Sequence, residues 1–276
     1  MTEKFQGPPG SNWICETCGV QFPGSEAPPE RCPICEDFRQ YVGLDGQRWT
    51  CLAEMRRTYK NEIAEIAPGV LSIHTQPKFG IGQRALVVKT SGLNVLWDCV
   101  TLIDDATVAV VREFGGISAI AISHPHYYST MVDWSSALGG VSIFIHEADR
   151  EWVMRPADSI QFWSGETKEI GSELTLIRCG GHFEGGQVMR AEAGALFTGD
   201  VIQVCPDRRW VSFMRSYPNY IPLPESSVRA IVGAVEPFEF DRLYGAWPKH
   251  EIAAGAKEAV RRSADRYIRA LREVIR

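Results

Sequence analysis

The sequence has no long hydrophobic run and no excess of basic residues. Its 29 Lys and Arg residues are outnumbered by 34 Asp and Glu residues, so the formal net charge is −5. Apart from a mixed run near the C-terminus there is no dense basic stretch, which argues against nucleic-acid binding. No stretch could span a bilayer, and the first ten residues lack the apolar segment of a secretory leader. We therefore expect no membrane or nucleic-acid partner and a cytoplasmic location.

Histidine is scarce, with six residues, whereas cysteine occurs eight times. Four cysteines fall in a metal-binding pattern and the other four are scattered, as expected in a reducing compartment. The four scattered cysteines are Cys51, Cys99, Cys179 and Cys205. With 276 residues, of which 45% are hydrophobic, the chain can bury a sizeable core. This length predicts one large domain or two smaller ones.

The metal-binding pattern occupies the N-terminal part of the chain. Cys15 and Cys18 form one Cys-x-x-Cys pair, and Cys32 and Cys35 form a second pair after thirteen intervening residues. Each pair presents two thiolates to one ion, and two pairs complete a tetrahedral sulfur site. The surrounding segment has too few apolar residues for a core of its own, so a bound metal must supply much of its folding energy.

This segment resembles the rubredoxin-like module of rubrerythrins. The resemblance rests on Trp-Ile-Cys-Glu-Thr-Cys-Gly-Val from Trp13 and on Pro-Pro-Glu-Arg-Cys-Pro-Ile-Cys up to Cys35. In that family the four cysteines hold one iron that passes electrons. Glu36 departs from the glycine that often follows the second pair, and zinc ribbons use the same ligands. Iron in a redox role and zinc in a structural role therefore both remain open.

After this module, short strands alternate with helices, which predicts an α/β layered architecture. We expect a four-cysteine module over residues 1–45, a connecting segment over 46–61 with a helix at about 50–63, and a large domain over 62–276. Strands are expected at 67–74, 83–90, 93–99, 116–122, 141–146, 173–179, 194–200 and 240–245. Helices are expected at 130–138 and, with apolar residues at helical spacing, at 253–275.

Polar residues of metal-binding type follow several of these strands. His124 and His126 come directly after the apolar run 116–122, one residue apart, so both imidazoles can face a common point. His182 is flanked by glycines, which free the backbone for close approach. Asp200 ends the strand 194–200. Each residue alone has an ordinary structural explanation, but together they form a candidate metal site.

The order of these residues resembles the metallo-β-lactamase fold over about residues 62–276. The matching motifs are a strand ending in Asp98, Ser-His-Pro-His at 123–126, Gly-Gly-His at 180–182 and Phe-Thr-Gly-Asp at 197–200. Members include glyoxalase II-type thioesterases, lactonases and persulfide dioxygenases. The resemblance implies an αββα sandwich with three histidines on one metal, Asp200 bridging to a second metal, and Asp98 supporting the site from behind.

The departures from the family pattern concern the second metal. The pattern His-x-His-x-Asp-His has Tyr128 and Ser129 at its last two positions here, and neither side chain is a good ligand for a divalent ion. Ala246 aligns with the family's late histidine, which leaves His250 as an uncertain ligand about one helical turn away. We therefore expect a degenerate site that holds one metal, zinc or iron.

A single metal still permits catalysis. Zinc with an open position supplies hydroxide for attack on a carbonyl, and ferrous iron on two histidines and a carboxylate would leave positions for oxygen and a thiol. Asp200 or Tyr128 would then replace the missing carboxylate, with Tyr128 acting as a hydrogen-bond donor. The segment 201–220 is rich in aromatic residues and arginines. It is expected either to hold substrate through Arg208, Arg209 and Arg215 or to form an ordinary hairpin.

Three functions follow from this reading. The first is a hydrolase of an ester, thioester or lactone, acting on a small-molecule substrate. The second is a mononuclear non-haem iron oxidoreductase that receives electrons from the four-cysteine module. The third is a binding protein whose catalytic site has decayed. A redox partner and a homodimer both stay open.

Overall fold

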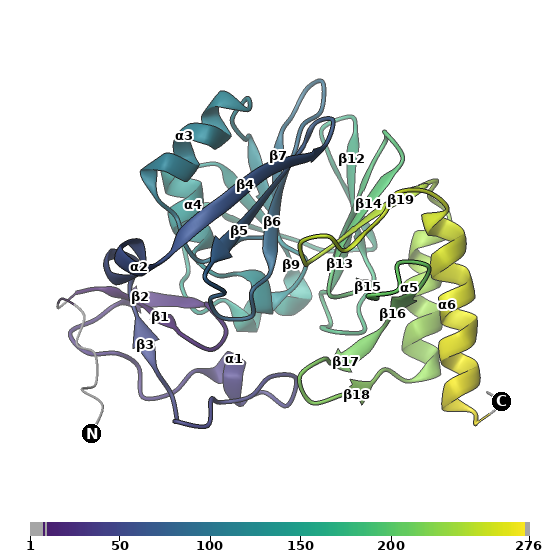
Figure 1. Ribbon diagram of the computed structural model, residues 1–276, viewed down its shortest axis with the longest axis horizontal. Helices are drawn as coiled ribbons and strands as arrows, with labels where there is room; N and C mark the ends of the chain where they lie inside the picture. Colours follow the sequence, from purple (N-terminus) through teal and green to yellow (C-terminus); the bar gives the residue numbers. More distant parts are fainter. Residues whose placement is uncertain (1–7, 9, 274–276) are drawn as a thin grey trace.

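Two β-sheets face each other in the centre of the molecule, and helices cover their outer faces (Figure 1). The computed structural model describes residue 8 and residues 10–273. Helices α3 (Asp105–Glu113) and α4 (Met131–Ala137) cover one sheet. Helices α5 (Glu225–Val235) and α6 (Ala256–Leu271) cover the other. This is the αββα sandwich that the sequence predicts.

The first sheet has seven strands in the order β10-β9-β8-β7-β6-β5-β4. Strands β4 to β7 pair antiparallel, whereas β7 to β10 run parallel. The parallel strands are short apolar runs because helices or the other sheet cover both their faces. The bounds are β4 (Lys60–Ala67), β5 (Val70–Gln76), β6 (Arg84–Val88), β7 (Val95–Trp97), β8 (Ala119–Ala121), β9 (Ser142–His146) and β10 (Ile160–Trp163).

The second sheet has six strands in the order β11-β12-β13-β14-β19-β20. Only β14 and β19 pair in parallel. The segment between these two strands contains two small hairpins and α5. The bounds are β11 (Thr167–Ile170), β12 (Leu174–Arg178), β13 (Gln187–Ala191), β14 (Ala195–Gly199), β19 (Arg242–Gly245) and β20 (Glu251–Ile252).

Three apolar layers hold the sandwich together. The layer between the sheets contains Trp97, Met189 and Phe197, each 2% exposed or less. A second layer lies beneath α3 and α4, and a third lies beneath α5 and α6. Strands that alternate inward and outward residues thus bury one face against the partner sheet and the other against a helix.

The helix expected over 50–63 is wrong in its second half. Helix α2 spans only Leu52–Thr58, and β4 begins at Lys60. The reason is tertiary, because β4 pairs with β5 along its whole length through a tight turn at Gly69, where φ is +77°. The division of the chain at residue 62 stays a prediction.

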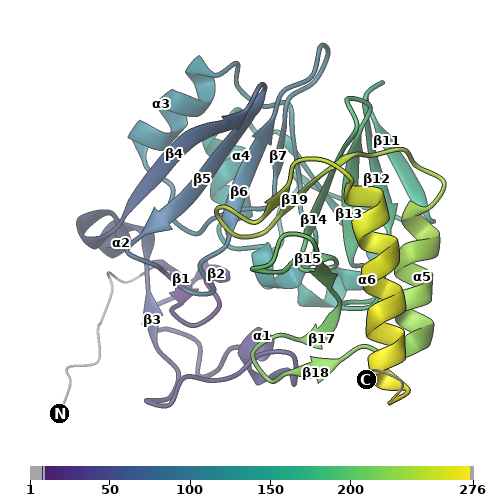
Figure 2. The same ribbon diagram turned by 45° about the vertical axis from the view of Figure 1, so that its right-hand side comes forward.

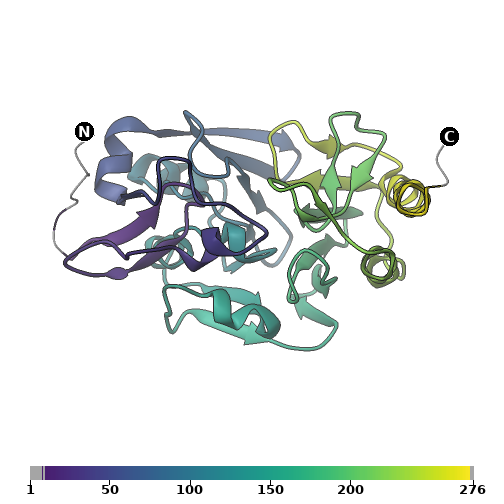
Figure 3. The same cartoon turned by 90° about the horizontal axis from the view of Figure 1, so that it is seen from below.

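The four-cysteine module lies across one end of the sandwich (Figure 3). Its small sheet has the order β2-β1-β3, and a one-turn helix, α1, contains Cys35. Bounds are β1 (Asn12–Cys15), β2 (Gln21–Gly24), β3 (Trp49–Thr50) and α1 (Pro33–Glu36). The buried core of the module continues into the sandwich through Ile81, Trp152 and Met154. The expected module over 1–45 includes residues 1–7 and 9, which lie outside the described residues.

The segment 201–220 contains strand hairpins rather than a continuous coil. The first hairpin pairs β15 (Gln203–Val204) with β16 (Val211–Ser212). The second pairs β17 (Met214–Ser216) with β18 (Ile221–Pro222), and it lies beside α1 in both Figures 1 and 2. The C-terminal helix expected over 253–275 is shorter, since α6 ends at Leu271 and Ile275 lies outside the described residues. Among the described residues, no helix has the length and apolar character needed to cross a membrane.

Candidate metal and active site

The first two histidines of the site follow β8 on a short loop. Asp98, at the end of β7, accepts a hydrogen bond from the Ser123 backbone N–H at 2.7 Å. The Ser123 hydroxyl in turn lies 2.9 Å from Nδ1 of His124. A 3-10 turn, η1 (Pro125–Tyr127), then brings His126 onto the same side as His124, with ring centroids 5.1 Å apart. Asp98 therefore holds the ligand loop from behind, as the family resemblance implies.

The third histidine comes from the opposite sheet. His182 lies on the glycine-rich loop between β12 and β13, where Gly180 and Gly181 have φ of +66° and +78°. Its Nδ1 lies 2.9 Å from the Met214 carbonyl oxygen, which fixes Nδ1 as the donor. Its Nε2 consequently faces His126, whose Nδ1 lies 3.3 Å away.

Asp200 completes the group at the end of β14. One carboxylate oxygen lies 3.7 Å from Nε2 of His124. The ligand atoms of the three histidines and Asp200 all lie within 4.8 Å of one another. All four side chains are buried, with at most 4% of any residue exposed. The structure thus brings together the residues that the sequence singles out.

These four residues fit a bound metal ion. Nε2 of His124, Nε2 of His126 and Oδ1 of Asp200 are buried without a hydrogen-bond partner. The His126 nitrogen that faces the group is Nδ1, which lies 3.3 Å from Nε2 of His182. A buried polar atom without a partner is destabilising, and a cation among the grouped ligand atoms would satisfy those of His124 and Asp200. Burial lowers the pKa of His124 and His126 well below 6.5 and that of His182 to about 4, so the imidazoles are neutral ligands at pH 7.

Burial has the opposite effect on the pKa of the two carboxyl groups beside the histidines. Burial raises the pKa of Asp200 to about 7, and the hydroxyl of Tyr127 offsets part of that rise. Burial also raises the pKa of Asp98 to about 8, against hydrogen bonds from Ser123 that lower it. Two buried carboxyls beside three neutral imidazoles are unfavourable without a nearby positive charge. A divalent ion supplies that charge, which is a second reason why the site fits a metal.

The four cysteines also fit one metal. Sγ of Cys15 lies 3.5 Å from that of Cys35, and Sγ of Cys18 lies 3.7 Å from that of Cys32. Sulfurs bonded to one tetrahedral zinc at about 2.3 Å would lie about 3.8 Å apart, so the spacing matches a shared ion. All four thiols are free of disulfide bonds. Gln47 donates its side-chain amide to Sγ of Cys15 at 3.1 Å.

A cavity of about 260 Å³ leads from the surface to the histidine group. His126, His182 and Asp200 form its floor. The other lining residues come from the four-cysteine module, from the loop between β5 and β6, and from two loops of the second sheet. They are Thr17, Gln40, Tyr41, Lys78, Gly80, Ile81, Tyr217, Pro218 and Trp247. The volume suits a small molecule.

Tyr128 does not take the role expected of it. Its side chain is 1% exposed, and its hydroxyl lies 3.5 Å from the Asp149 carbonyl, away from the cavity. Ser129 is likewise engaged, because its hydroxyl contacts the Cys99 carbonyl at 3.3 Å and accepts from Gln83 at 3.1 Å. The two positions that hold a second metal in the family pattern therefore serve packing here.

The three arginines and His250 also lie outside the group. Arg209 is exposed and pairs with Asp207, and Arg208 lines a different cavity, beside β19 and β20. Arg215 is near enough to lower the pKa of His182 slightly, but it does not line the cavity. His250 contacts the carbonyl of Pro248 through Nδ1 and is not among the grouped ligand atoms. None of these four residues lines the cavity or joins the grouped ligand atoms, and their expected roles stay predictions.

Residues that the sequence analysis missed stand beside the site. The hydroxyl of Tyr127, one position before Tyr128, is buried without a partner, and its ring lies 4.3 Å from that of His124. Its position next to His126 could have suggested this role. Lys78 and Arg39 carried no such signal, because each is a single basic residue in a mixed segment far from the histidines in sequence.

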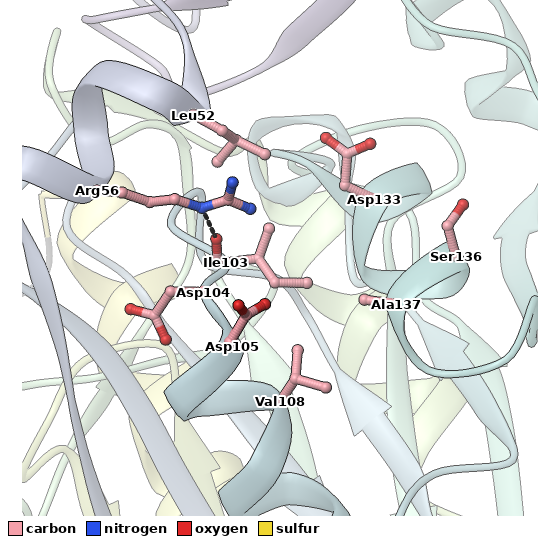
Figure 4. A pocket seen from close by; sticks show the side chains of 9 residues that line it. All are labelled: Leu52, Arg56, Ile103, Asp104, Asp105, Val108, Asp133, Ser136 and Ala137. Atoms are coloured by element: carbon pink, nitrogen blue, oxygen red, sulfur yellow. Dashed lines mark hydrogen bonds between the residues drawn. The ribbon is translucent and has the colours of Figure 1, made fainter.

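Another cavity, of about 420 Å³, lies between α2, α3 and α4 (Figure 4). Three of its polar side chains, those of Arg56, Asp104 and Asp133, already have partners. Arg56 donates to the Ile103 carbonyl at 3.0 Å, and Asp104 caps α3 by accepting from the Thr107 backbone. Asp133 accepts from Gln21 and Arg155. The contact between Gln21 and Asp133 joins the module to the sandwich, and we assign no ligand to this cavity.

The comparison of sequences identifies one relative over almost the whole chain. No protein-family model matches the chain. The "Uncharacterized protein YmaE" of Bacillus subtilis (strain 168) is 50% identical over 266 residues, which cover 94% of this chain and 96% of the relative. The chain belongs to the YmaE family. The activity of this YmaE-family chain must therefore be argued from its own site.

Solved structures show the fold of this YmaE-family chain. VMB-1 matches with a TM-score of 0.58 at 13% identity, covering 77% of this chain and 98% of that protein. The DIM-1 metallo-β-lactamase matches with 0.56 at 15%, covering 75% and 97%. FIM-1 from Pseudomonas aeruginosa, in its mono-zinc form, matches with 0.54 at 16%, covering 75% and 95%. The fold is that of the metallo-β-lactamases, and about a quarter of this chain lies beyond it.

Proposed function

We propose that the protein is a metal-dependent hydrolase of an ester, thioester or lactone, with one metal ion held by His124, His126, His182 and Asp200. The observation that carries this proposal is the set of buried, unpartnered ligand atoms at the floor of a cavity. A zinc ion bound there would polarise a carbonyl and lower the pKa of its bound water to about 7.

The surrounding residues determine how this chemistry would proceed. Asp200 is the one carboxylate among the described residues that line the cavity, and its oxygen not bound to the metal would accept a proton near the reacting centre. The Tyr127 hydroxyl lies near enough to that carboxyl to lower its pKa. The floor residues are almost wholly buried, so the cavity limits the water that reaches the substrate.

A single metal is favoured because the positions that hold a second metal in the family pattern are already bonded or lack a ligand atom. Tyr128 and Ser129 bond to backbone or neighbouring side chains, and Ala246 offers no ligand atom. The carbonyl of Ala246 accepts from the Arg84 backbone at 2.8 Å, so this segment is also fixed. Only Asp200 remains from the set that would anchor a second ion.

One observation favours an oxidoreductase as the second candidate. Thr17, which lies between Cys15 and Cys18, lines the same cavity as His126. The sulfur site therefore adjoins the histidine site within one chain, as electron transfer between two irons would require. The resemblance of the module to that of rubrerythrins supports this candidate and stays a prediction.

The test is metal analysis of the protein purified without added metal, together with assays on a simple ester, thioester and lactone. We expect His182→Ala to lose about one metal equivalent and most turnover, because the site then keeps only two of its three imidazole ligands. His74→Ala is the matched control, since His74 pairs with Glu62 on β4 and is not among the grouped ligand atoms. Unchanged metal content and activity in His182→Ala would contradict the proposal.

The same preparation separates the alternatives. Iron at the sulfur site, with a red colour that bleaches on reduction, would favour the oxidoreductase. Zinc at both sites with turnover would favour the hydrolase. Full metal occupancy without turnover of any of the three substrates would favour a binding protein whose catalytic site has decayed.

A further inference from the structure

The four-cysteine module forms one wall of the cavity above the histidine group. Thr17 comes from the first cysteine pair, and Gln40 and Tyr41 follow the second pair. The module is fixed in this place by the sandwich. The side chain of Asn219 donates to the carbonyls of Phe38 and Gln40 at 2.9 and 2.8 Å.

Gln40 is the buried polar group on this wall. The residue is 5% exposed, and its side chain lines the cavity. Among the described residues its side-chain amide makes no hydrogen bond, although its backbone carbonyl is bonded. An amide that has no protein partner and lines a cavity is free to donate to a ligand bound there.

Lys78 supplies the only cation among the lining residues. It lies on the loop between β5 and β6, which Phe79 anchors in the core with 7% exposure. Among the described residues no carboxylate lies within ion-pair distance of its amine. Its stem packs over Gly82, where a Cβ would come within 2.7 Å of Cε of Lys78. The glycine therefore lets the lysine lie along the loop at the cavity.

We propose that the module and Lys78 together form a subsite for an anionic group, so that the substrate is a small acyl compound that carries a carboxylate. The metal end of the substrate would meet His126, His182 and Asp200, and its carboxylate would bind the Lys78 amine and the Gln40 amide. Two donors of this kind, one charged, match a carboxylate. This inference rests on the proposed function, because it assumes a metal at the histidine group.

The test uses thiols as probes, because a thiolate binds the metal whether or not the protein is an enzyme. Mercaptoacetate, 3-mercaptopropionate and 4-mercaptobutyrate carry a carboxylate at increasing distance, and 2-mercaptoethanol is the neutral counterpart. Binding to the metal-loaded full chain is measured by calorimetry, with metal content checked after each titration. We expect one of the three acids to bind about tenfold more tightly than 2-mercaptoethanol.

Variants then locate the source of that preference. Lys78→Met and Gln40→Leu should each weaken binding of the preferred acid by about threefold to tenfold and leave 2-mercaptoethanol unaffected. Lys78→Arg should restore part of the loss. Lys168→Met on β11 and the exposed Gln161→Leu on β10 are the matched controls and should change nothing.

The outcomes distinguish this subsite from the metal site beneath it. If acids and neutral thiol bind equally, or if the two variants behave as the controls do, the subsite is wrong and the metal site stands. If no thiol binds to protein that contains metal at both sites, the open metal position is absent. That result overturns both the subsite and the proposed function.

Discussion

At the scale of single residues, the site depends on how burial changes proton binding. Burial lowers the pKa of His182 from 6.5 to about 4. The unfolded chain takes up this proton as the pH falls through 6.5, whereas the folded chain does so only near 4. The neutral, metal-binding form of the folded protein therefore persists well below the usual range of histidine.

This shift predicts how the metal is lost on acidification. We expect acidification to weaken metal binding in two stages, because Asp200 takes up a proton near pH 7 whereas His182 stays neutral until the pH approaches about 4. Equilibrium dialysis across this range, with metal counted in the wild type and in His182→Ala, measures it. Complete release of the His182-dependent metal by pH 6, with no second stage near 4, would show that the imidazole is not held neutral by burial.

Sequence alone identifies the ligands but not the residues around them. His124, His126, His182 and Asp200 each follow a strand end or a glycine pair, and such local signals are visible in one sequence. Tyr128 was expected at the site because it occupies the aspartate position of the family pattern. The 3-10 turn after His124 instead brings Tyr127 beside His124 and Asp200.

At the scale of elements, the turn after β14 controls the position of His124. Gly199 has φ of +52°, and a Cβ there would lie 2.2 Å from Oγ and 2.6 Å from Cβ of Ser123. Ser123 contacts Nδ1 of His124 and is itself held by Asp98. The second sheet thus presses directly on the ligand loop of the first, and only glycine permits that approach.

Gly199→Ala should therefore damage both stability and metal binding. We expect about 3 kcal/mol of destabilisation from the backbone strain and the clash with Ser123, and weaker metal binding because His124 moves. Gly194→Ala is the control, since φ there is +78° with nothing within 4 Å of the added Cβ, so only the strain of about 1 kcal/mol remains. Denaturant unfolding and metal titration check both. Equal effects of the two substitutions would mean that the contact with Ser123 is unimportant.

Most of the strands could be predicted from the sequence, whereas strand pairing determined where some of them begin. The strands around residues 84–88, 142–146 and 195–199 are short and apolar and were recognisable as such. Residues 60–63 were not recognised as a strand, because their sequence also permits a helix. Their place in the long pairing of β4 with β5 makes them a strand. The small hairpins at 203–222 are short, so the sequence pattern alone left both a hairpin and a substrate-binding role open.

At the scale of the whole molecule, one buried ion pair connects the two metal sites. Arg39 follows the second cysteine pair, and Asp37 binds its guanidinium through both carboxylate oxygens, at 2.5 and 3.0 Å. Although burial opposes it, this pairing lowers the pKa of Asp37. The guanidinium then lies 3.8 Å above the ring of Phe183 and donates to the His182 carbonyl at 3.4 Å. No sequence signal linked these segments, which are far apart in the chain.

Arg39→Leu should accordingly weaken the histidine site from a distance. The variant leaves Asp37 unpaired and removes the contacts that fix the ligand loop, so we expect about 3 kcal/mol of destabilisation and about tenfold weaker metal binding at the histidine group. Arg57→Leu, on the exposed face of α2, is the control. The four-cysteine metal, counted by thiol protection, should be unaffected, because Arg39 contacts none of the sulfurs.

If the four-cysteine metal were lost as well, the variant would have unfolded the module. Arg39→Lys would then separate the two effects, since it keeps the charge but not the paired geometry. If Arg39→Leu changed neither metal, the two sites would be independent despite their contact.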